Sequence, residues 1–270
     1  MKKTIIAAMA AAVIALSSCS ENDHDINQDP VLLKGEKVKV ADGEAWTYIE
    51  TSFDNKPLKA GIVLTEAAIP EMHTGGRVKH GGHGDAPESI IYTLRLPENK
   101  SATVFDHVTM DWNPHGHPPE NVYTKAHFDF HFYMESEAEL NKIPPFEVDS
   151  IGHKTYPAPD YLPKNYIPIP GGVPKMGVHW ADITSPELNP QNPAPFTQTF
   201  IYGTYNGKVN FYEPMVTGEY LKALTGKFER SIPQPAKYAR TGYYPTKMSV
   251  TKIPGGYQVE LSEFIYRQQS

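Results

Sequence analysis

The chain has 270 residues, including 25 prolines, 16 tyrosines and one cysteine, and its formal net charge at pH 7 is −6. The acidic balance without clustered basic residues argues against a nucleic-acid partner. The single cysteine, Cys19, excludes an internal disulfide and a thiolate metal site. Many prolines and tyrosines favour short strands joined by rigid loops over a helical bundle.

The N-terminus has the features of a bacterial lipoprotein signal. Lys2 and Lys3 precede an unbroken apolar run, residues 5–16, which is too short for a permanent membrane span. Leu16-Ser17-Ser18-Cys19 resembles a lipobox, which implies cleavage before Cys19 and attachment of acyl chains such as palmitate to it. Ser20 at the next position favours the outer membrane of the cell envelope. The alternative is an ordinary secretory signal cut near Ser18.

We therefore expect residues 1–18 to be a signal peptide, residues 19–34 a polar tether and residues 35–270 one β-rich domain. The expected fold is mainly β, a sandwich or barrel-like domain with long proline-rich loops and one or two short helices. Predicted strands cover residues 37–40, 45–52, 58–66, 89–96, 104–112 and 126–134. The glycine-rich segment 71–88 is predicted to be a mobile surface loop.

The C-terminal half mixes short helices, loops and hairpins. A capping box at Ser136 predicts a short helix that ends before Pro144, and residues 217–225 predict another. Residues 157–195 contain ten prolines and predict a long irregular loop. Hairpins are predicted over residues 197–217 and 248–266.

Residues 126–134 (AHFDFHFYM) divide their chemistry between two faces. Because strand side chains alternate, Phe128, Phe130, Phe132 and Met134 form one apolar face. His127, Asp129, His131 and Tyr133 form the other, where two imidazoles with a carboxylate between them can converge on an ion.

The hairpin over residues 197–217 has Asn206-Gly207 at its tip, which favours a type I′ turn. The resulting register pairs Tyr205 with Lys208 and places Phe200 opposite Glu213. A carboxylate on that aromatic face needs a cation, a metal or a hydrogen-bond donor.

Histidines and acids elsewhere supply further candidate ligands. His115 and His117 lie two residues apart across Gly116, and His179 lies within the proline-rich segment 157–195. Imidazole and carboxylate ligands without thiolate suit Zn, Fe, Mn, Ni or Cu. A metal-free hydrogen-bonded polar core and a pH-responsive histidine cluster are the alternatives. The candidate metal ligands are His115, His117, His127, His131, His179 and Glu213, with Glu120 and Asp129 either as hydrogen-bond partners that orient the ligands or as alternative ligands.

Several blocks resemble an uncharacterised family of exported bacterial proteins, a domain of unknown function. The blocks span about residues 40–220 and are DWNPHGH at 111–117, AHFDFHFY at 126–133, GVHW at 177–180, FIYG at 200–203 and EPM at 213–215. The resemblance brings no reaction with it, but it implies that the six candidate ligands belong to one site. His115-Gly116-His117 with Glu120 is also loosely similar to the first cupin motif. Glu120 lies closer than in cupins, and no second cupin motif surrounds His179.

Three functions follow as expectations. The first is a metal-binding lipoprotein of unknown function, held to the membrane by its lipid anchor. The second is an extracytoplasmic metal-dependent hydrolase or oxidase, although the sequence contains no separate nucleophile motif. The third is a metal-free structural or oligomeric envelope protein, for which the tyrosines and proline-rich loops suit an interface between identical chains.

Overall fold

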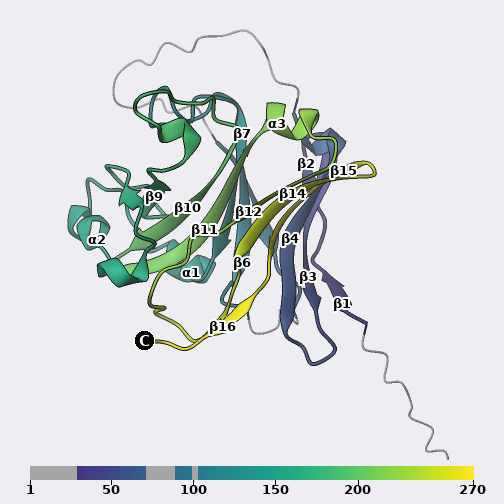
Figure 1. Cartoon of the computed structure of the whole chain (residues 1–270), viewed down its shortest axis with the longest axis horizontal. Helices are drawn as coiled ribbons and strands as arrows, with labels where there is room; N and C mark the ends of the chain where they lie inside the picture. The colour runs from purple at the N-terminus through teal and green to yellow at the C-terminus, as the bar shows by residue number, and fades with distance from the viewer. Residues whose placement is uncertain (1–28, 71–88, 99–102) are drawn as a thin grey trace, which may run out of the picture.

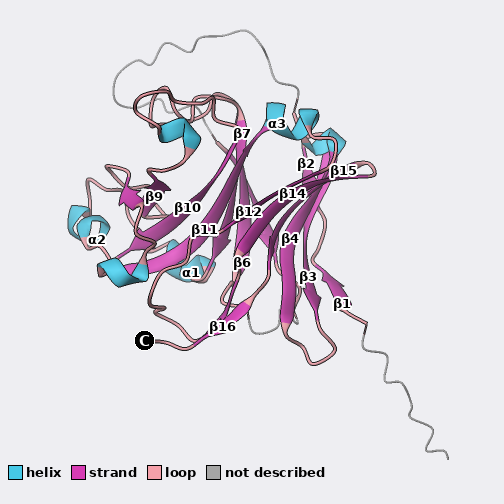
Figure 2. Ribbon diagram, viewed as in Figure 1, coloured by secondary structure: helices cyan, strands magenta, loops and turns pink. Residues whose placement is uncertain are grey.

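Alternating apolar and polar residues fold into a β-sandwich of two packed sheets, not a closed barrel (Figures 1 and 2). The computed structural model describes residues 29–70, 89–98 and 103–270. The predicted signal peptide, most of the predicted tether and the predicted loop 71–88 lie outside the described residues. No helix in the described part of the chain is long and apolar enough to cross a membrane.

Sheet A has seven antiparallel strands. Their order is β1 (Val31–Lys34), β3 (Gly43–Thr51), β4 (Pro57–Thr65), β15 (Gly256–Ser262), β14 (Lys247–Ile253) and β12 (Lys227–Ser231), and β2 (Val38–Val40) also pairs with β3. β1 occupies the last four residues of the predicted tether, because these residues pair with residues 48–51 of β3.

Sheet B also has seven antiparallel strands and carries the candidate ligands. Their order is β5 (Ile90–Arg95), β6 (His107–Asn113), β7 (His127–Tyr133), β11 (Lys208–Thr217), β10 (Gln198–Tyr205), β9 (Val178–Asp182) and β8 (Tyr166–Pro168). A small third sheet pairs β13 (Gly242–Tyr244) with β16 (Ile265–Arg267).

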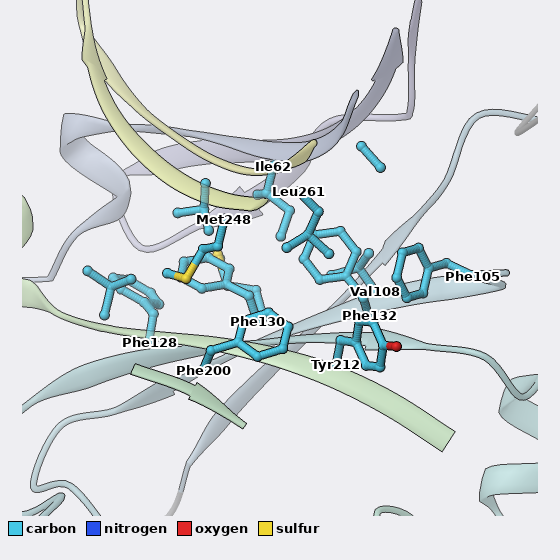
Figure 3. Close-up of a cluster of buried hydrophobic side chains, with 14 of the residues drawn as sticks. Ile62, Phe105, Val108, Phe128, Phe130, Phe132, Phe200, Tyr212, Met248 and Leu261 are labelled. Carbon is cyan, nitrogen blue, oxygen red and sulfur yellow. The ribbon is translucent and has the colours of Figure 1, made fainter. Parts of the chain in front are cut away.

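The main hydrophobic core lies between the two sheets (Figure 3). Phe128, Phe130 and Phe132 of β7 are fully buried in it, as the predicted alternation requires. They belong to one cluster with Ile62, Met248 and Leu261 of sheet A. The aromatic face of the 126–134 prediction is therefore the core face of sheet B.

We call the opposite side of sheet B, which faces away from sheet A, the outer face. Every residue of β6 and β7 is buried, so this face is covered as well. α2 and the loops around β9 lie on this side of β10 and β11 (Figure 1). Two small apolar clusters pack there, one of Tyr123, Phe196, Ile201 and Met215, and one of Tyr133, Leu140, Ile143 and Phe211.

The helices are short. They are α1 (Glu137–Leu140), α2 (Ser150–Lys154), α3 (Gly218–Ala223) and the 3-10 turns η1 (Glu66–Ala68), η2 (Pro159–Tyr161) and η3 (Pro186–Leu188). The Ser136 side chain accepts a hydrogen bond from the backbone N–H of Glu139, as the capping box predicts. The sequence did not predict α2, which Asp149 caps.

Two predictions about the C-terminal half were wrong. The proline-rich segment 157–195 contains β8 and β9, because the run Val178–Asp182 has no proline and pairs with β10. In the 197–217 hairpin, Tyr205 pairs with Lys208 as predicted, but a β-bulge shifts the register between Gly203 and Thr204. Glu213 therefore lies opposite Ile201, not Phe200, and its side chain points to the outer face.

Candidate metal centre

The register of sheet B gathers polar side chains on the outer face. Residues Thr109, Asp111 and Asn113 of β6 lie directly opposite His131, Asp129 and His127 of β7. All six side chains are buried. Buried polar groups at this density need partners for their hydrogen bonds and charges.

β11 and β9 add an acid and an imidazole to this face. Met215 of β11 pairs with Asp129, and Glu213, two residues away, shares its face of the strand. Ile201 of β10 lies opposite Glu213, and Gly203 of β10 lies opposite His179 of β9. His179 and Glu213, far from β7 in sequence, thus join the same polar layer.

His117, His127 and Asp129 form the first ligand cluster, which we call the His117 group. Their candidate ligand atoms all lie within 4.8 Å of one another. Nε2 of His117 is 3.1 Å from Oδ2 of Asp129, and Nε2 of His127 is 3.1 Å from Oδ1. Around a tetrahedral ion with metal–nitrogen bonds of about 2.0–2.1 Å, neighbouring ligand atoms lie roughly 3.3 Å apart. The two nitrogen–oxygen separations, one at each oxygen of the carboxylate, are close to this value.

Both imidazoles of the His117 group use Nδ1 for a backbone carbonyl. Nδ1 of His117 lies 2.7 Å from the Pro118 oxygen, and Nδ1 of His127 lies 2.6 Å from the Lys125 oxygen. Because a carbonyl oxygen only accepts, each Nδ1 carries a proton, and the neutral ring presents a lone pair at Nε2. The Nε2 lone pairs of His117 and His127 then face the negatively charged Asp129 carboxylate. This arrangement is repulsive unless a proton or a metal cation lies between the nitrogen and oxygen atoms.

Asp129 is held as a carboxylate. Burial alone would raise its pKa, but the charges of His127 and His117 and the hydrogen bond with His117 hold that pKa well below its usual value. Asn113 donates from Nδ2 to Oδ2 over 2.8 Å. Burial lowers the pKa of His117, but the hydrogen bond and charge of Asp129 outweigh it and raise that pKa above its usual value. In the metal-free protein, a proton on His117 thus faces this carboxylate.

A sharp turn brings His117 to the site. Gly116 has φ +68°, and a Cβ at this position would lie 2.2 Å from the carbonyl oxygen of Tyr123. The backbone N–H of His117 donates to that same oxygen over 3.0 Å. Glycine is therefore needed here for both its conformation and its size. The rings of Tyr123 and Phe196 pack edge-on against His117 and His127 respectively.

His131, His179 and Glu213 form the second cluster, the His131 group, whose candidate ligand atoms also lie within 4.8 Å of one another. Nε2 of His131 is 3.6 Å from Oε1 of Glu213, and Nε2 of His179 is 3.6 Å from Oε2. Burial lowers the pKa of His131 to about 4 and that of His179 to about 3. Burial, together with the charges of Asp129 and Asp111, raises the pKa of Glu213 well above its usual value.

The structure separates the predicted ligands. His115 and Glu120 are exposed in the turn after β6, and neither belongs to a cluster that the described residues form. The remaining five predicted metal ligands divide between two groups, whereas the family resemblance implied one site. Asp129, predicted as a hydrogen-bond partner of the ligands or as an alternative ligand, lies within the His117 group. The predicted lipidation site, Cys19, lies outside the described residues.

Sequence reasoning missed Asp111 and Asn113. Asn113 donates to Asp129, and Oδ2 of Asp111 lies 3.6 Å from Nδ1 of His131. The alternation of the predicted strand 104–112 already placed Asp111 on the face that carries His107 and Thr109. The missing information was the pairing of this strand with residues 127–133, which brings that face beside the imidazoles.

Part of the chain is similar to an uncharacterised protein family. The model of the family described as "TTHB210-like: Hypothetical protein TTHB210" matches residues 54–112. This segment, less than a quarter of the chain, contains β4, β5 and most of β6. It includes Asp111 but none of the six residues in the two groups. Searches of the curated proteins and of the solved structures found no match.

Proposed function

We propose that this protein binds a divalent transition-metal ion through Nε2 of His117, Nε2 of His127 and the carboxylate of Asp129. The observation that supports this proposal is the orientation of the two imidazoles. Each ring donates a hydrogen bond from Nδ1 to a backbone carbonyl oxygen, and Nε2 of each ring faces the Asp129 carboxylate. Two imidazoles and a carboxylate suit Zn, Fe, Mn, Ni or Cu.

The competing explanation is a metal-free polar core, in which the same side chains satisfy one another. That explanation requires each buried polar atom to have a hydrogen-bond partner. Within the described residues, Nε2 of His127 and Oδ1 of Asp129 make no hydrogen bond. Unpartnered buried nitrogen and oxygen atoms 3.1 Å apart favour a cation between them.

A metal-dependent hydrolase is the second candidate function, because the His117 group offers three protein ligands and has one side open to solvent. The His117 side chain is 30% exposed, whereas those of His127 and Asp129 are 0% and 6% exposed. Structural zinc sites have four protein ligands, and catalytic sites keep a position for water. The metal-loaded chain would then hydrolyse nitrophenyl esters, and a chelator would abolish this activity.

The proposed metal site is tested with the full chain, purified without a histidine tag. Elemental analysis gives the metal content as isolated, and titration calorimetry of the chelator-treated protein with Zn²⁺ gives the affinity. We expect His127→Gln and His117→Gln each to weaken binding by more than about 100-fold, because removing only a hydrogen-bond partner of a metal ligand already costs about 10–100-fold.

His115→Gln is the matched control, because His115 lies two residues from His117 but is exposed and outside both groups. It should bind Zn²⁺ as the wild type does. Protein that contains no metal, takes up no Zn²⁺ and melts at the same temperature with or without chelator would rule out the proposal. It would leave the structural, metal-free function.

We also propose that the protein is located in the bacterial cell envelope and is anchored there by lipid at Cys19. Its support is the charged start, the apolar run 5–16 and the lipobox-like Leu16-Ser17-Ser18-Cys19. Buried acyl chains contribute about 0.8 kcal/mol per CH₂, so a multiply acylated cysteine holds a protein stably. Metabolic labelling with a palmitate analogue should mark the wild type and Ser20→Ala but not Cys19→Ser. Equal labelling of Cys19→Ser would refute the anchor.

A further inference from the structure

The His131 group lies deeper in the protein than the His117 group. The side chains of His131 and Glu213 are each 1% exposed, and that of His179 is 16% exposed. Nε2 of His131 and Oε2 of Glu213 make no hydrogen bond within the described residues. Each of these two buried atoms therefore lies 3.6 Å from a candidate ligand atom of another member of the group, without a hydrogen bond.

Aromatic packing fixes the rings of this group. The Phe211 ring contacts His131 and His179 edge-on, with centroid separations of 5.0 and 5.1 Å. The Tyr133 ring stacks on His131 at an interplanar angle of 9°. A Cβ on Gly203 would lie 1.9 Å from the Phe211 ring, so the glycine makes room for that ring. The ligands are therefore held by packing on rigid strands.

The other nitrogen of His131 faces possible acceptors. Nδ1 lies 3.6 Å from Oδ2 of Asp111 and 3.4 Å from Oγ1 of Thr109. Metal-binding histidines commonly direct their second nitrogen toward a carboxylate, which fixes the tautomer and the ring orientation. Asp111 is placed to act in this way as a positioning residue, leaving Nε2 of His131 directed toward Glu213.

We propose that the His131 group is a second, shielded binding site for a divalent transition-metal ion, formed by Nε2 of His131, Nε2 of His179 and the Glu213 carboxylate. This site goes beyond the proposed function and uses none of the ligands of the His117 group. The two sites differ in access, because solvent reaches the first through His117 but meets only the partly exposed edge of His179 at the second. The chain binds two ions, one that exchanges quickly and one that exchanges slowly.

The test uses the full chain loaded with Zn²⁺ and freed of excess ion. The bound Zn²⁺ is counted by elemental analysis, and its release to a chromophoric chelator is followed over time. The wild type should hold two ions and release them in a fast and a slow phase. Glu213→Gln, which keeps the size of the side chain, should lose one ion and the slow phase. His127→Gln should lose one ion and the fast phase.

His179→Asn provides a second variant should Glu213→Gln fail to fold, because His179 is the most exposed member of the group. It too should lose the slow phase. One ion in the wild type, lost in His127→Gln but kept in Glu213→Gln and His179→Asn, would overturn the second site and leave the proposed function standing. One ion with the opposite pattern would overturn the first site only. Two ions released in a single phase would overturn the shielded assignment, and no ion at all would overturn both sites.

Discussion

Asp111 and Asp129 lie directly opposite each other on β6 and β7, and both are buried. Their surroundings differ: Asp129 has two imidazoles and Asn113 beside it, and its pKa is held well below the usual value. Burial and the charge of Asp129 raise the pKa of Asp111 well above its usual value. Like charges at opposed positions are destabilising, so the charged form of Asp111 is disfavoured when no metal is bound.

Replacing Asp111 with asparagine should stabilise the metal-free protein. The amide keeps the shape and an acceptor oxygen but removes an acid that burial and Asp129 disfavour. We expect a gain of about 1–3 kcal/mol in the free energy of unfolding, measured with denaturant in the presence of a chelator. The control Asp42→Asn, at an exposed acid in the turn between β2 and β3, should change it by less than about 0.5 kcal/mol. Destabilisation by Asp111→Asn would show that the carboxyl group makes a favourable contact.

Replacing Gly116 with alanine should damage both stability and metal binding. The new Cβ would meet the Tyr123 carbonyl at 2.2 Å, and the chain has φ +68° there. Gly171 is the matched control, because it has φ +100° but no atom within 4 Å of an added Cβ. Gly171→Ala should cost about 1–3 kcal/mol from backbone strain alone. Gly116→Ala should cost more and weaken Zn²⁺ binding, and equal effects on the two variants would contradict this account.

Removing a core ring from β7 should separate stability from metal binding. Phe130 is fully buried between the sheets, and Phe130→Ala should cost about 3–5 kcal/mol of unfolding free energy. Because the ligands lie on the opposite face of the strand, the folded variant should still gain stability when Zn²⁺ is added. Phe53, which is 57% exposed, supplies the control: Phe53→Ala should change stability by less than about 0.5 kcal/mol. Loss of the Zn²⁺ effect in Phe130→Ala would show that the two faces are coupled.

The cap of α2 should make stability depend on pH in the acid range. Tyr205 donates its hydroxyl to Asp149 over 2.5 Å, and the backbone N–H of Gly152 donates over 2.9 Å, which together lower the pKa of Asp149. A carboxylate with a lowered folded pKa stabilises the protein above its unfolded value of about 3.9, and loses this contribution as pH falls through the folded pKa.

Asp149→Asn should therefore be less stable than the wild type at pH 7, and the difference should shrink as the pH falls below about 4. Urea unfolding at a series of pH values measures it. Asp160→Asn, at an exposed acid of η2, is the control and should change stability at pH 7 by less than about 0.5 kcal/mol. A constant difference at every pH would mean that the charge of Asp149 contributes nothing.

The faces of β6 and β7 could be predicted from the sequence, because their two sides carry different chemistry. Phe128, Phe130 and Phe132 alternate with His127, Asp129 and His131, and both sets lie where the alternation placed them. The fold class followed from the same signal repeated in other strands.

The position of Glu213 could not be predicted, because it depends on a bulge that the hairpin sequence does not reveal. The extra residue in β11 is Asn210, whose Nδ2 donates to the carbonyl of Met176 over 2.6 Å. This partner lies in another part of the chain, so a local turn rule gives a register that fails beyond the tip. The division of the ligands into two groups was hidden for a similar reason, since it depends on the order β6-β7-β11-β10-β9.

One face of β7 contributes phenylalanine side chains to the hydrophobic core, and the other face contributes ligands to both groups. Because strand side chains alternate with a period of two, gain or loss of one residue inside β7 would exchange the faces beyond that point. Imidazoles would enter the space between the sheets, and phenylalanine rings would replace them under the covering loops. A single-codon insertion or deletion in this strand would thus abolish folding and ion binding in one event, so length changes in this region of the gene are tolerated only in the connections on either side.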